Sequence, residues 1–182
     1  ESVKVDGSAL PVSLLRGSKT TEATLDIADW GLRHLSGHMI GAITRENKSL
    51  LDFNIKHNTL GASGAAAVVN GLGDAPIRSL DMTRNNIGEA TAAQVQSFAL
   101  AICKCLGSLL ELRMDENDLE CPASALAPIC KLRSLRVVSM EKNKLSALPA
   151  LIGTMTSLRR LSMHSNQISE LPVAMCLLTG LE

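Results

Sequence analysis

The chain contains few side-chain combinations that could bind a metal ion. His34 and His38 are four residues apart, a spacing that can put two zinc-ligating imidazoles on one helix face, but no glutamate follows the first histidine and no third ligand is near. Cys103 and Cys105 are two apart in a predicted helix, where their side chains diverge, and the sequence has no Cys-x-x-Cys pair. We therefore expect no metal site and interpret both cysteines as small buried hydrophobic residues.

Catalytic and nucleotide-binding motifs are equally weak. Gly17-Ser18-Lys19-Thr20 is similar to a phosphate-binding loop, but the Gly-Lys-Ser/Thr order is broken and Val12 stands where the earlier glycine belongs. No nucleophile has a base at a motif spacing, and no motif sets a pair of acidic residues apart. We therefore predict that the chain is not an enzyme and uses no cofactor.

Composition narrows the classes of partner. The 182 residues, 46% of them hydrophobic, suffice for one sizeable domain, and the 18 Lys and Arg balance the 18 Asp and Glu, so no global field attracts nucleic acid. Five cysteines are an odd number without pairing logic, which favours a reducing compartment. No stretch approaches the roughly twenty apolar residues of a membrane span. We expect a cytoplasmic protein that binds neither nucleic acid nor the membrane interior, and we attribute the glycosylation-like sequence Asn47-Lys48-Ser49 to chance.

A short phrase recurs along the chain: two apolar residues two positions apart, then a polar residue, usually Asn, then another apolar residue. Its instances are Leu25-Ile27-Trp30-Leu32, Phe53-Ile55-Asn58-Leu60, Leu80-Met82-Asn85-Ile87, Leu112-Met114-Asn117-Leu119, Val138-Met140-Asn143-Leu145 and Leu161-Met163-Asn166-Ile168, with a weaker seventh, Val3-Val5-Ser8-Leu10. Recurrence every two to three dozen residues is the signature of a solenoid. Each apolar pair would face the core from a short strand, since alternate strand residues share one face.

The phrase resembles the leucine-rich-repeat family, L-x-x-L-x-L-x-x-N-x-L, over nearly the whole chain. The resemblance implies an α/β fold, a right-handed horseshoe solenoid with a parallel concave sheet and helical or irregular convex returns, forming a single domain over residues 1–182 with six to seven turns. Helical returns expected at residues 61–72 and 89–106 are similar to the ribonuclease-inhibitor class of repeat. The later Leu148-Pro149 and Leu171-Pro172 returns are similar to the plant-intracellular or Ras-group class, and residues 121–130 form the transition.

The recurring asparagines should form a ladder that binds the backbone where each turn leaves its strand. Asn58, Asn85, Asn117, Asn143 and Asn166 are its expected rungs, and Trp30 and Ser8 replace asparagine in the first turns. The sequence begins within the phrase at Val3 and stops at Leu181, where the next leading leucine is due. We therefore expect a segment of a longer protein, with room for neighbouring repeats or domains at both ends.

The strand residues that point away from the core form the predicted binding surface. They combine acidic and basic groups, an arrangement that gives specificity and register more than affinity. The candidate residues are Asp52, Asn54, Lys56, His57, Asp81, Thr83, Arg84, Arg113, Asp115, Glu116, Glu141, Lys142, Arg160 and His164. Arginine is a common interface anchor, so Arg84, Arg113 and Arg160 lead the set.

The predicted function is recognition of another protein, as a scaffold or adaptor that uses its concave strand face. One alternative is a regulatory or sensing module of a larger protein, such as a small GTPase regulator, a kinase or an immune receptor. Another is a structural component of a cytoskeletal or ciliary assembly. The sequence does not separate these alternatives, because the fold that it indicates hosts all of them.

Overall fold

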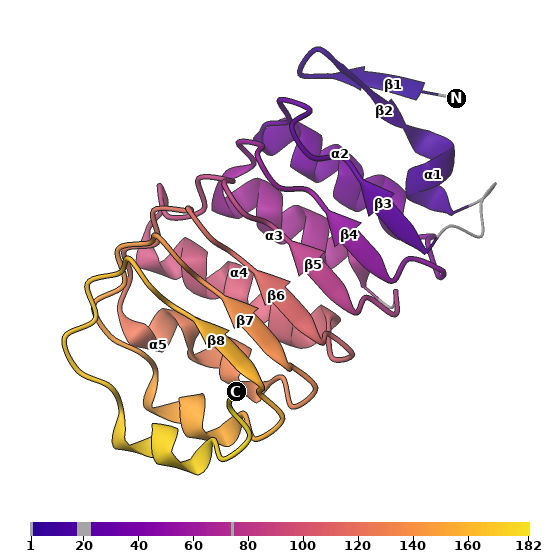
Figure 1. Ribbon diagram of the computed structural model, residues 1–182. Helices are drawn as coiled ribbons and strands as arrows, with labels where there is room; N and C mark the ends of the chain where they lie inside the picture. Colours follow the sequence, from indigo (N-terminus) through magenta and orange to yellow (C-terminus); the bar gives the residue numbers. More distant parts are fainter. Residues whose placement is uncertain (1, 18–22, 74) are drawn as a thin grey trace.

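A single arc of parallel strands dominates the computed structural model, which describes residues 2–17, 23–73 and 75–182. Figure 1 shows the strands side by side in chain order, with a layer of helices behind them. The sheet has six strands: β3 (Thr24–Asp26), β4 (Asp52–Asn54), β5 (Ser79–Asp81), β6 (Glu111–Arg113), β7 (Val137–Ser139) and β8 (Arg160–Ser162). The predicted solenoid is confirmed. The phosphate-loop-like motif lies mostly in residues 18–22, outside the described residues.

The core consists of the two apolar columns that the phrase predicts. The register places Leu25, Phe53, Leu80, Leu112, Val138 and Leu161 beside one another, one from each strand. All of them are buried except Leu161, which is packed against the core in the last turn. The second column contains the completely buried Met82 and Met114. The recurring methionines are therefore core residues, as their alternation with polar residues predicts.

The returns change from helices to 3-10 turns along the chain. They are α2 (His34–Thr44), α3 (Gly61–Leu72), α4 (Ala92–Cys105), α5 (Ala123–Leu126) with η1 (Ala127–Lys131), η2 (Ala150–Thr154) and η3 (Val173–Leu177). Helix α4 begins at Ala92 and not at residue 89, because Thr91 and Gln94 form a reciprocal capping box there. Pro149 and Pro172 precede η2 and η3, where a fixed φ and a missing N–H favour a short return.

Glycines allow α2 and α3 to pack backbone against backbone. A Cβ atom added at Gly41 would lie 2.1 Å from the carbonyl oxygen of Ala67, and one added at Gly71 would lie 2.0 Å from the carbonyl oxygen of Gly41. No side chain fits in either place. The close approach makes α2 and α3 a rigid support for strands β3 and β4.

The prediction that the first phrase forms a seventh parallel turn is wrong. β1 (Ser2–Val5) and β2 (Ser8–Pro11) pair antiparallel in a separate hairpin, followed by α1 (Val12–Arg16). Asp6 and Gly7 both have positive φ and supply the two-residue turn that favours a hairpin. Hairpin and repeat strands share the two-residue alternation, but the Asp6-Gly7 dipeptide between them was a hairpin signal that the repeat pattern obscured. Ser2, Lys4 and Asp6 therefore do not belong to the concave sheet.

The hairpin instead closes the N-terminal end of the solenoid. Asp6 accepts hydrogen bonds from the N–H groups of Arg33 and Ser36 and, at 2.5 Å, from the Ser36 hydroxyl, so it caps α2, whose N-terminus has no cap of its own. The hydrogen bond from the Ser36 side chain holds the pKa of Asp6 below its usual value. The buried Asn47 side chain adds a tie from the first turn to α1, through the carbonyl oxygens of Leu14 and Leu15.

The asparagine ladder is confirmed, with one irregular rung. The Asn117 amide nitrogen donates to Met82 O at 2.9 Å, and its Oδ1 accepts from the backbone N–H groups of Asn85 and Ile87 at 2.8 and 3.3 Å. Asn143 makes the equivalent bonds one turn later. In contrast, Asn85 Oδ1 is buried without a partner, because the N–H of Asn58 donates to Arg84 O instead. The rung at Asn85 therefore stabilises the stack through its donors alone.

The cysteines only partly match their predicted role. Cys121 and Cys130 are buried, and desolvation raises the pKa of the Cys130 thiol to about 11, which keeps it neutral and unreactive. The prediction that Cys103 and Cys105 are buried is wrong, since both are half-exposed on α4. The apolar stripe of α4 runs through Val95, Phe98 and Ile102, and the cysteines lie beside it. His34 and His38 are also exposed, and His38 lies 3.2 Å from the Ser63 hydroxyl.

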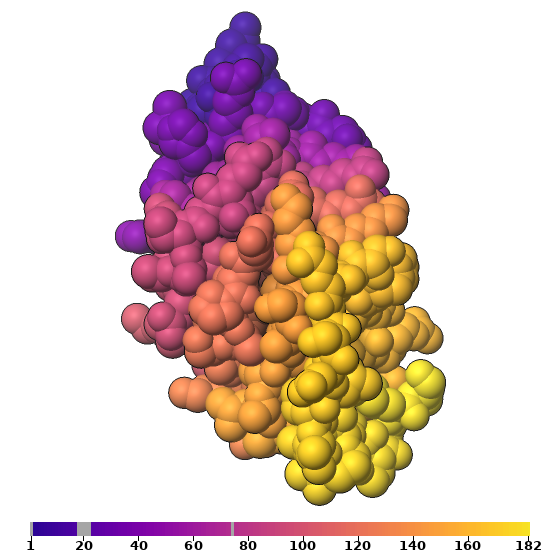
Figure 2. Space-filling model, turned by 90° about the vertical axis from the view of Figure 1, so that its left-hand side faces the viewer, coloured from indigo at the N-terminus to yellow at the C-terminus, as the bar shows by residue number. Residues whose placement is uncertain are grey.

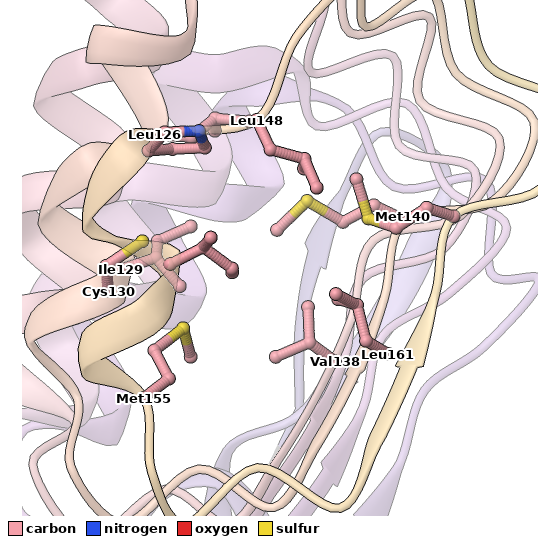
Figure 3. A pocket seen from close by; sticks show the side chains of 11 residues that line it. Leu126, Ile129, Cys130, Val138, Met140, Leu148, Met155 and Leu161 are labelled. Atoms are coloured by element: carbon pink, nitrogen blue, oxygen red, sulfur yellow. The ribbon is translucent and has the colours of Figure 1, made fainter. Parts of the chain in front are cut away.

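A small apolar cavity lies between the sheet and the 3-10 layer near the C-terminal end. Its volume is about 20 Å³. Figure 3 shows Val138 and Leu161 on the strand side, facing Ile129, Cys130 and Met155 across the gap. The lining is entirely apolar, so a water molecule there would find no hydrogen-bond partner. The position equivalent to Val138 is Leu or Phe in all the other turns. The smaller side chain of valine leaves the cavity.

The ladder predicts unequal costs for two similar substitutions. Asn117→Ala should lower the free energy of unfolding by about 1 kcal/mol more than Asn85→Ala, because Asn117 also accepts two backbone N–H groups that would become unsatisfied. Both side chains are completely buried, so the cavities created are alike. Urea unfolding of the two variants measures the difference, and equal losses would contradict the ladder as described.

Filling the cavity should stabilise the protein. Val138→Leu is expected to raise the free energy of unfolding by about 1 kcal/mol, since one more methylene group is buried in existing space. The matched control is Val137→Leu, where the side chain lies on the opposite face and no gain is expected. Chemical denaturation of both variants checks this, and destabilisation by Val138→Leu would show that the space cannot accept a larger side chain.

Candidate functional site

Four outward side chains from each turn build the concave face. Two lie on the strand and two follow it, and the fourth position is held in the left-handed conformation in every turn: Asp29, His57, Arg84, Glu116, Lys142 and Ser165 have φ between 49° and 59°. This conformation is unfavourable for residues with a side chain and persists where the surroundings enforce it. It aligns the fourth positions into a row beside the asparagine ladder.

The structure brings the predicted site residues onto one face. Asp52 and Asn54 lie on β4, Asp81 on β5, Arg113 on β6 and Arg160 on β8. The remaining candidates follow the ends of strands β4 to β8: Lys56, His57, Thr83, Arg84, Asp115, Glu116, Glu141, Lys142 and His164. Because parallel strands in register keep equivalent residues adjacent, each candidate has neighbours from the turns before and after it.

Three of these residues form a network across neighbouring turns. Arg84 lies 2.6 Å from Glu116 Oε2 through Nη2, and Lys142 Nζ lies 3.2 Å from Glu116 Oε1. The hydrogen bonds from Arg84 and Lys142 hold the pKa of the Glu116 carboxyl below its usual value. Glu116 therefore stays ionised over a wider pH range than a free glutamate. A hollow between the turns is lined by this network together with His57, Asn86 and Asp118.

Arg113 sits among carboxylates at the centre of the sheet. Its Nε donates a hydrogen bond to Glu111 Oε1 at 2.5 Å, and this bond, with the nearby charges of Glu111, Asp81 and Asp115, raises the pKa of the guanidinium. Arg84 and Arg113 were expected to be available anchors, and both already have intramolecular partners. Among the described residues, Lys56 and Arg160 form no ion pair with a carboxylate.

Further contacts fix the polar side chains of adjacent turns. Asp115 Oδ1 accepts from the Ser139 hydroxyl and from the N–H of Glu141, both at 2.6 Å. His164 lies 2.6 Å from Glu141, and His57 lies 3.0 Å from Asp29. These contacts restrict the rotamers of the face before any partner arrives, which lowers the conformational entropy lost on binding.

Sequence reasoning missed the partners that fix the candidate residues. Glu111 holds Arg113, Asp29 holds His57, and Asp26 accepts a hydrogen bond at 2.9 Å from the Asn54 side chain. A signal existed for Glu111, because residues two apart on a strand share a face. The pairs that span two turns had no such signal, since their spacing depends on the length of the intervening return.

Charges on the concave face are not balanced. The carboxylates are Asp26, Asp29, Asp52, Asp81, Glu111, Asp115, Glu116 and Glu141, and the basic side chains are Lys56, Arg84, Arg113, Lys142 and Arg160. Eight acidic against five basic groups leave a net charge of −3 with histidine neutral, while the chain as a whole has net charge zero. Asp52 and Asp81 contribute acidic groups that no ion pair within the described residues neutralises.

Other kinds of site find no support in the described ranges. No group of three His, Cys, Asp or Glu side chains there could hold a metal ion. A search of the same residues finds no helix with the length and apolar character that crossing a membrane requires.

Comparisons with known proteins identify the fold. The family model described as "Leucine Rich repeat" matches residues 46–69. A leucine-rich-repeat protein of Leptospira interrogans is similar in structure with a TM-score of 0.67 and 19% identity, over 93% of this chain and 38% of that protein. An internalin C2 of Listeria monocytogenes gives a TM-score of 0.41 and 16% identity over 96% of this chain and 83% of its own, too low to support an argument. No curated protein matches. The chain therefore has the fold of a leucine-rich-repeat solenoid, and the mixture of repeat classes stays a prediction.

The Glu116 network predicts a specific dependence of stability on pH. A carboxyl whose pKa is lowered on folding stabilises the protein above its unfolded pKa, and that stabilisation is lost as the pH falls through the folded value. Glu116→Gln should therefore lower the melting temperature slightly at pH 7 and reduce the further fall between pH 6 and pH 3. Glu170→Gln, an exposed site without an ion pair among the described residues, is the control. Identical pH profiles for Glu116→Gln and the native chain would contradict the expectation.

Proposed function

We propose that this chain binds another protein on its concave face and acts as a scaffold or adaptor. The leucine-rich-repeat fold generally mediates protein–protein interaction, and the aligned outward positions of six strands offer an extended surface of the kind that suits a protein. The predicted cytoplasmic location belongs to the same proposal and is supported by the odd number of cysteines.

The strongest support for this proposal is the charge imbalance of the concave face. The acidic excess would attract a partner surface rich in Lys or Arg, while the paired Arg84 and Arg113 would set the register of the contact. The side chains of the face are held by hydrogen bonds and ion pairs to adjacent turns, so the partner would meet a largely preformed surface.

Neutralising Asp52 and Asp81 should weaken the binding of a genuine partner. Asp52→Asn combined with Asp81→Asn removes two negative charges and keeps the oxygen that accepts from the Thr83 N–H. We expect about a tenfold loss of affinity and a smaller dependence of affinity on salt. Quantitative capture from lysate with the native chain and the variant, followed by calorimetry on each captured protein, measures both effects.

The matched control removes the same charge elsewhere. Glu46→Gln combined with Glu120→Gln alters two exposed acids that lie off the strands, and binding should be unchanged. Unfolding curves of both double variants establish that stability is retained. A partner whose affinity falls equally in the two variants, or in neither, would rule out recognition through the acidic part of the concave face.

A further inference from the structure

We propose that the outer helical face of the solenoid, made by α2, α3 and α4, is a second interaction surface that binds an amphipathic α-helix with acidic residues in its first turn. Figure 1 shows the three helices side by side behind the sheet, away from the concave face. In the space-filling view, the purple to pink segments that contain them lie between the indigo hairpin and the yellow last turn (Figure 2). The outer helical face therefore belongs to the middle of the body and to neither end.

The outer helical face carries almost no charge. Its helices have 11, 12 and 14 residues, and Lys104 is the only Asp, Glu, Lys or Arg in them, whereas 20% of the residues in the whole chain are charged. A helix at the surface normally carries charged side chains on the side that faces water. Depletion of charged residues is the compositional mark of the centre of a protein interface. The composition of this face is therefore that of a contact surface.

Large apolar side chains point outward from the two flanking helices. Leu35 on α2 is 56% exposed and Leu100 on α4 is 50% exposed. Met39 is also exposed, and it lies four residues after Leu35, on the same side of α2. The stripe that α4 buries in the core runs through Phe98 and Ile102, so Leu100 does not serve the core. These outward apolar groups are contact area that the fold itself does not use.

A groove runs along α3 between the two flanking helices. Its floor consists of short side chains of α3, namely Ala62, Ser63, Ala66, Ala67 and Asn70. One wall includes His38 of α2, and the other includes Ser97 of α4. The floor residues recur at spacings of three and four, so the groove follows the axis of α3 for about 12 Å, or about two helical turns.

The lining of the groove favours a helix over an extended segment. An extended segment needs partners for its backbone N–H and C=O groups, and the side chains of Ala62, Ala66 and Ala67 provide none. A helix satisfies its own backbone and needs only a surface against which its side chains can pack. Its apolar stripe would lie over α3, with Met39 on one side and Leu100 on the other.

Two basic residues define the chemistry at one end of the groove. Arg45 follows His38 by seven residues and thus continues the side of α2 that faces the groove. Lys104 follows Ser97 by seven residues on the exposed side of α4. Among the described residues, neither basic group forms an ion pair with a carboxylate. Their charge is complementary to an acidic group on the occupant.

The direction of the three helices sets the orientation of the occupant. Each helix follows a strand of one parallel sheet, so all three run the same way, and their C-terminal ends lie at the edge that carries Arg45 and Lys104. An antiparallel occupant places its N-terminal turn at this edge, where the helix dipoles attract and where acidic residues also stabilise the occupant's own helix. Glu46, the carboxylate next to Arg45, lies 3.8 Å from Arg16 of α1 and is directed away from the groove.

The area of the face separates a single helix from a second copy of the chain. Three helices about 10 Å apart and about 18 Å long span on the order of 400 Å² between the axes of α2 and α4. A stable dimer usually buries about 800 Å² on each partner. The outer helical face offers about half of that area, which matches one docked helix.

The first experiment selects the occupant from a display library of helical peptides of about 16 residues. Peptides selected on the native chain are then measured on Ser63→Glu, which puts a charge into the floor of the groove. We expect the selected peptides to carry an apolar stripe and an Asp or Glu in the first turn. Their affinity should fall about tenfold for Ser63→Glu, because the docked helix would bury the new charge without a partner.

The matched control is Ser124→Glu, the same substitution at an exposed serine of α5, outside the outer helical face. Its affinity for the selected peptides should equal that of the native chain. Unfolding curves of Ser63→Glu and Ser124→Glu establish that both variants keep the native stability, so that a loss of affinity reports on the groove.

Reversing the basic charges tests the complementarity directly. Arg45→Glu combined with Lys104→Glu should weaken an acidic peptide about tenfold. The same peptide with its acidic residues replaced by Lys should recover part of this loss on the reversed variant. Arg78→Glu combined with Lys131→Glu is the control, since these two exposed basic residues lie outside the three helices.

Three results would overturn the proposal. In the first, no selected peptide distinguishes Ser63→Glu from Ser124→Glu. In the second, reversal of Arg45 and Lys104 leaves the affinity unchanged. In the third, the native chain dimerises and Ser63→Glu abolishes the dimer, because the occupant would then be a second copy. None of these results bears on the concave face, which the Asp52 and Asp81 variants test separately.

Discussion

The structure depends on satisfying the backbone at the bend where each turn leaves its strand. That bend is buried, and its peptide groups point between turns where no regular ladder can reach them. An asparagine side chain solves the problem because it donates and accepts at once, as Asn117 does between Met82 O and the amides of Asn85 and Ile87. One residue type at one position thereby fixes the distance between turns. The strands, the apolar columns and the concave face all inherit their register from it.

The parts of the fold that depend on periodicity could be predicted from sequence. Phe53, Leu80 and Leu112 alternate with polar residues, so their shared column followed from strand geometry alone. The hairpin could not be separated by alternation, because Val3 and Val5 show it too, and the available signal was the Asp6-Gly7 dipeptide, whose positive φ angles form the turn. The location of the candidate site was predictable and its internal pairing was not. Arg84 meets Glu116 across a return of irregular length, which no short-range spacing encodes.

The ion pairs of the concave face bear on what the face can recognise. Arg84 and Arg113 are held by Glu116 and Glu111, so a partner must compete with an existing pair to use either arginine. Such competition makes the net gain from each contact small, and exposed pairs contribute little by themselves. Discrimination between partners then comes from the pattern of charge along the whole face. Among the described residues, the acidic groups of the face that form no ion pair are Asp26, Asp52, Asp81 and Asp115, and they give the face its net negative charge.

Polarity along the solenoid follows from the same bonding rule. The residue after each strand donates its N–H to the turn that follows, as Met114 does to Ser139 O, whereas the residue before each strand donates to the turn that precedes it, as Arg136 does to Leu110 O. At the N-terminal end the hairpin and Asp6 cover the core without reproducing a repeat. A segment that is not a repeat can close that end because Asp6 supplies the acceptor that the N-terminus of α2 lacks.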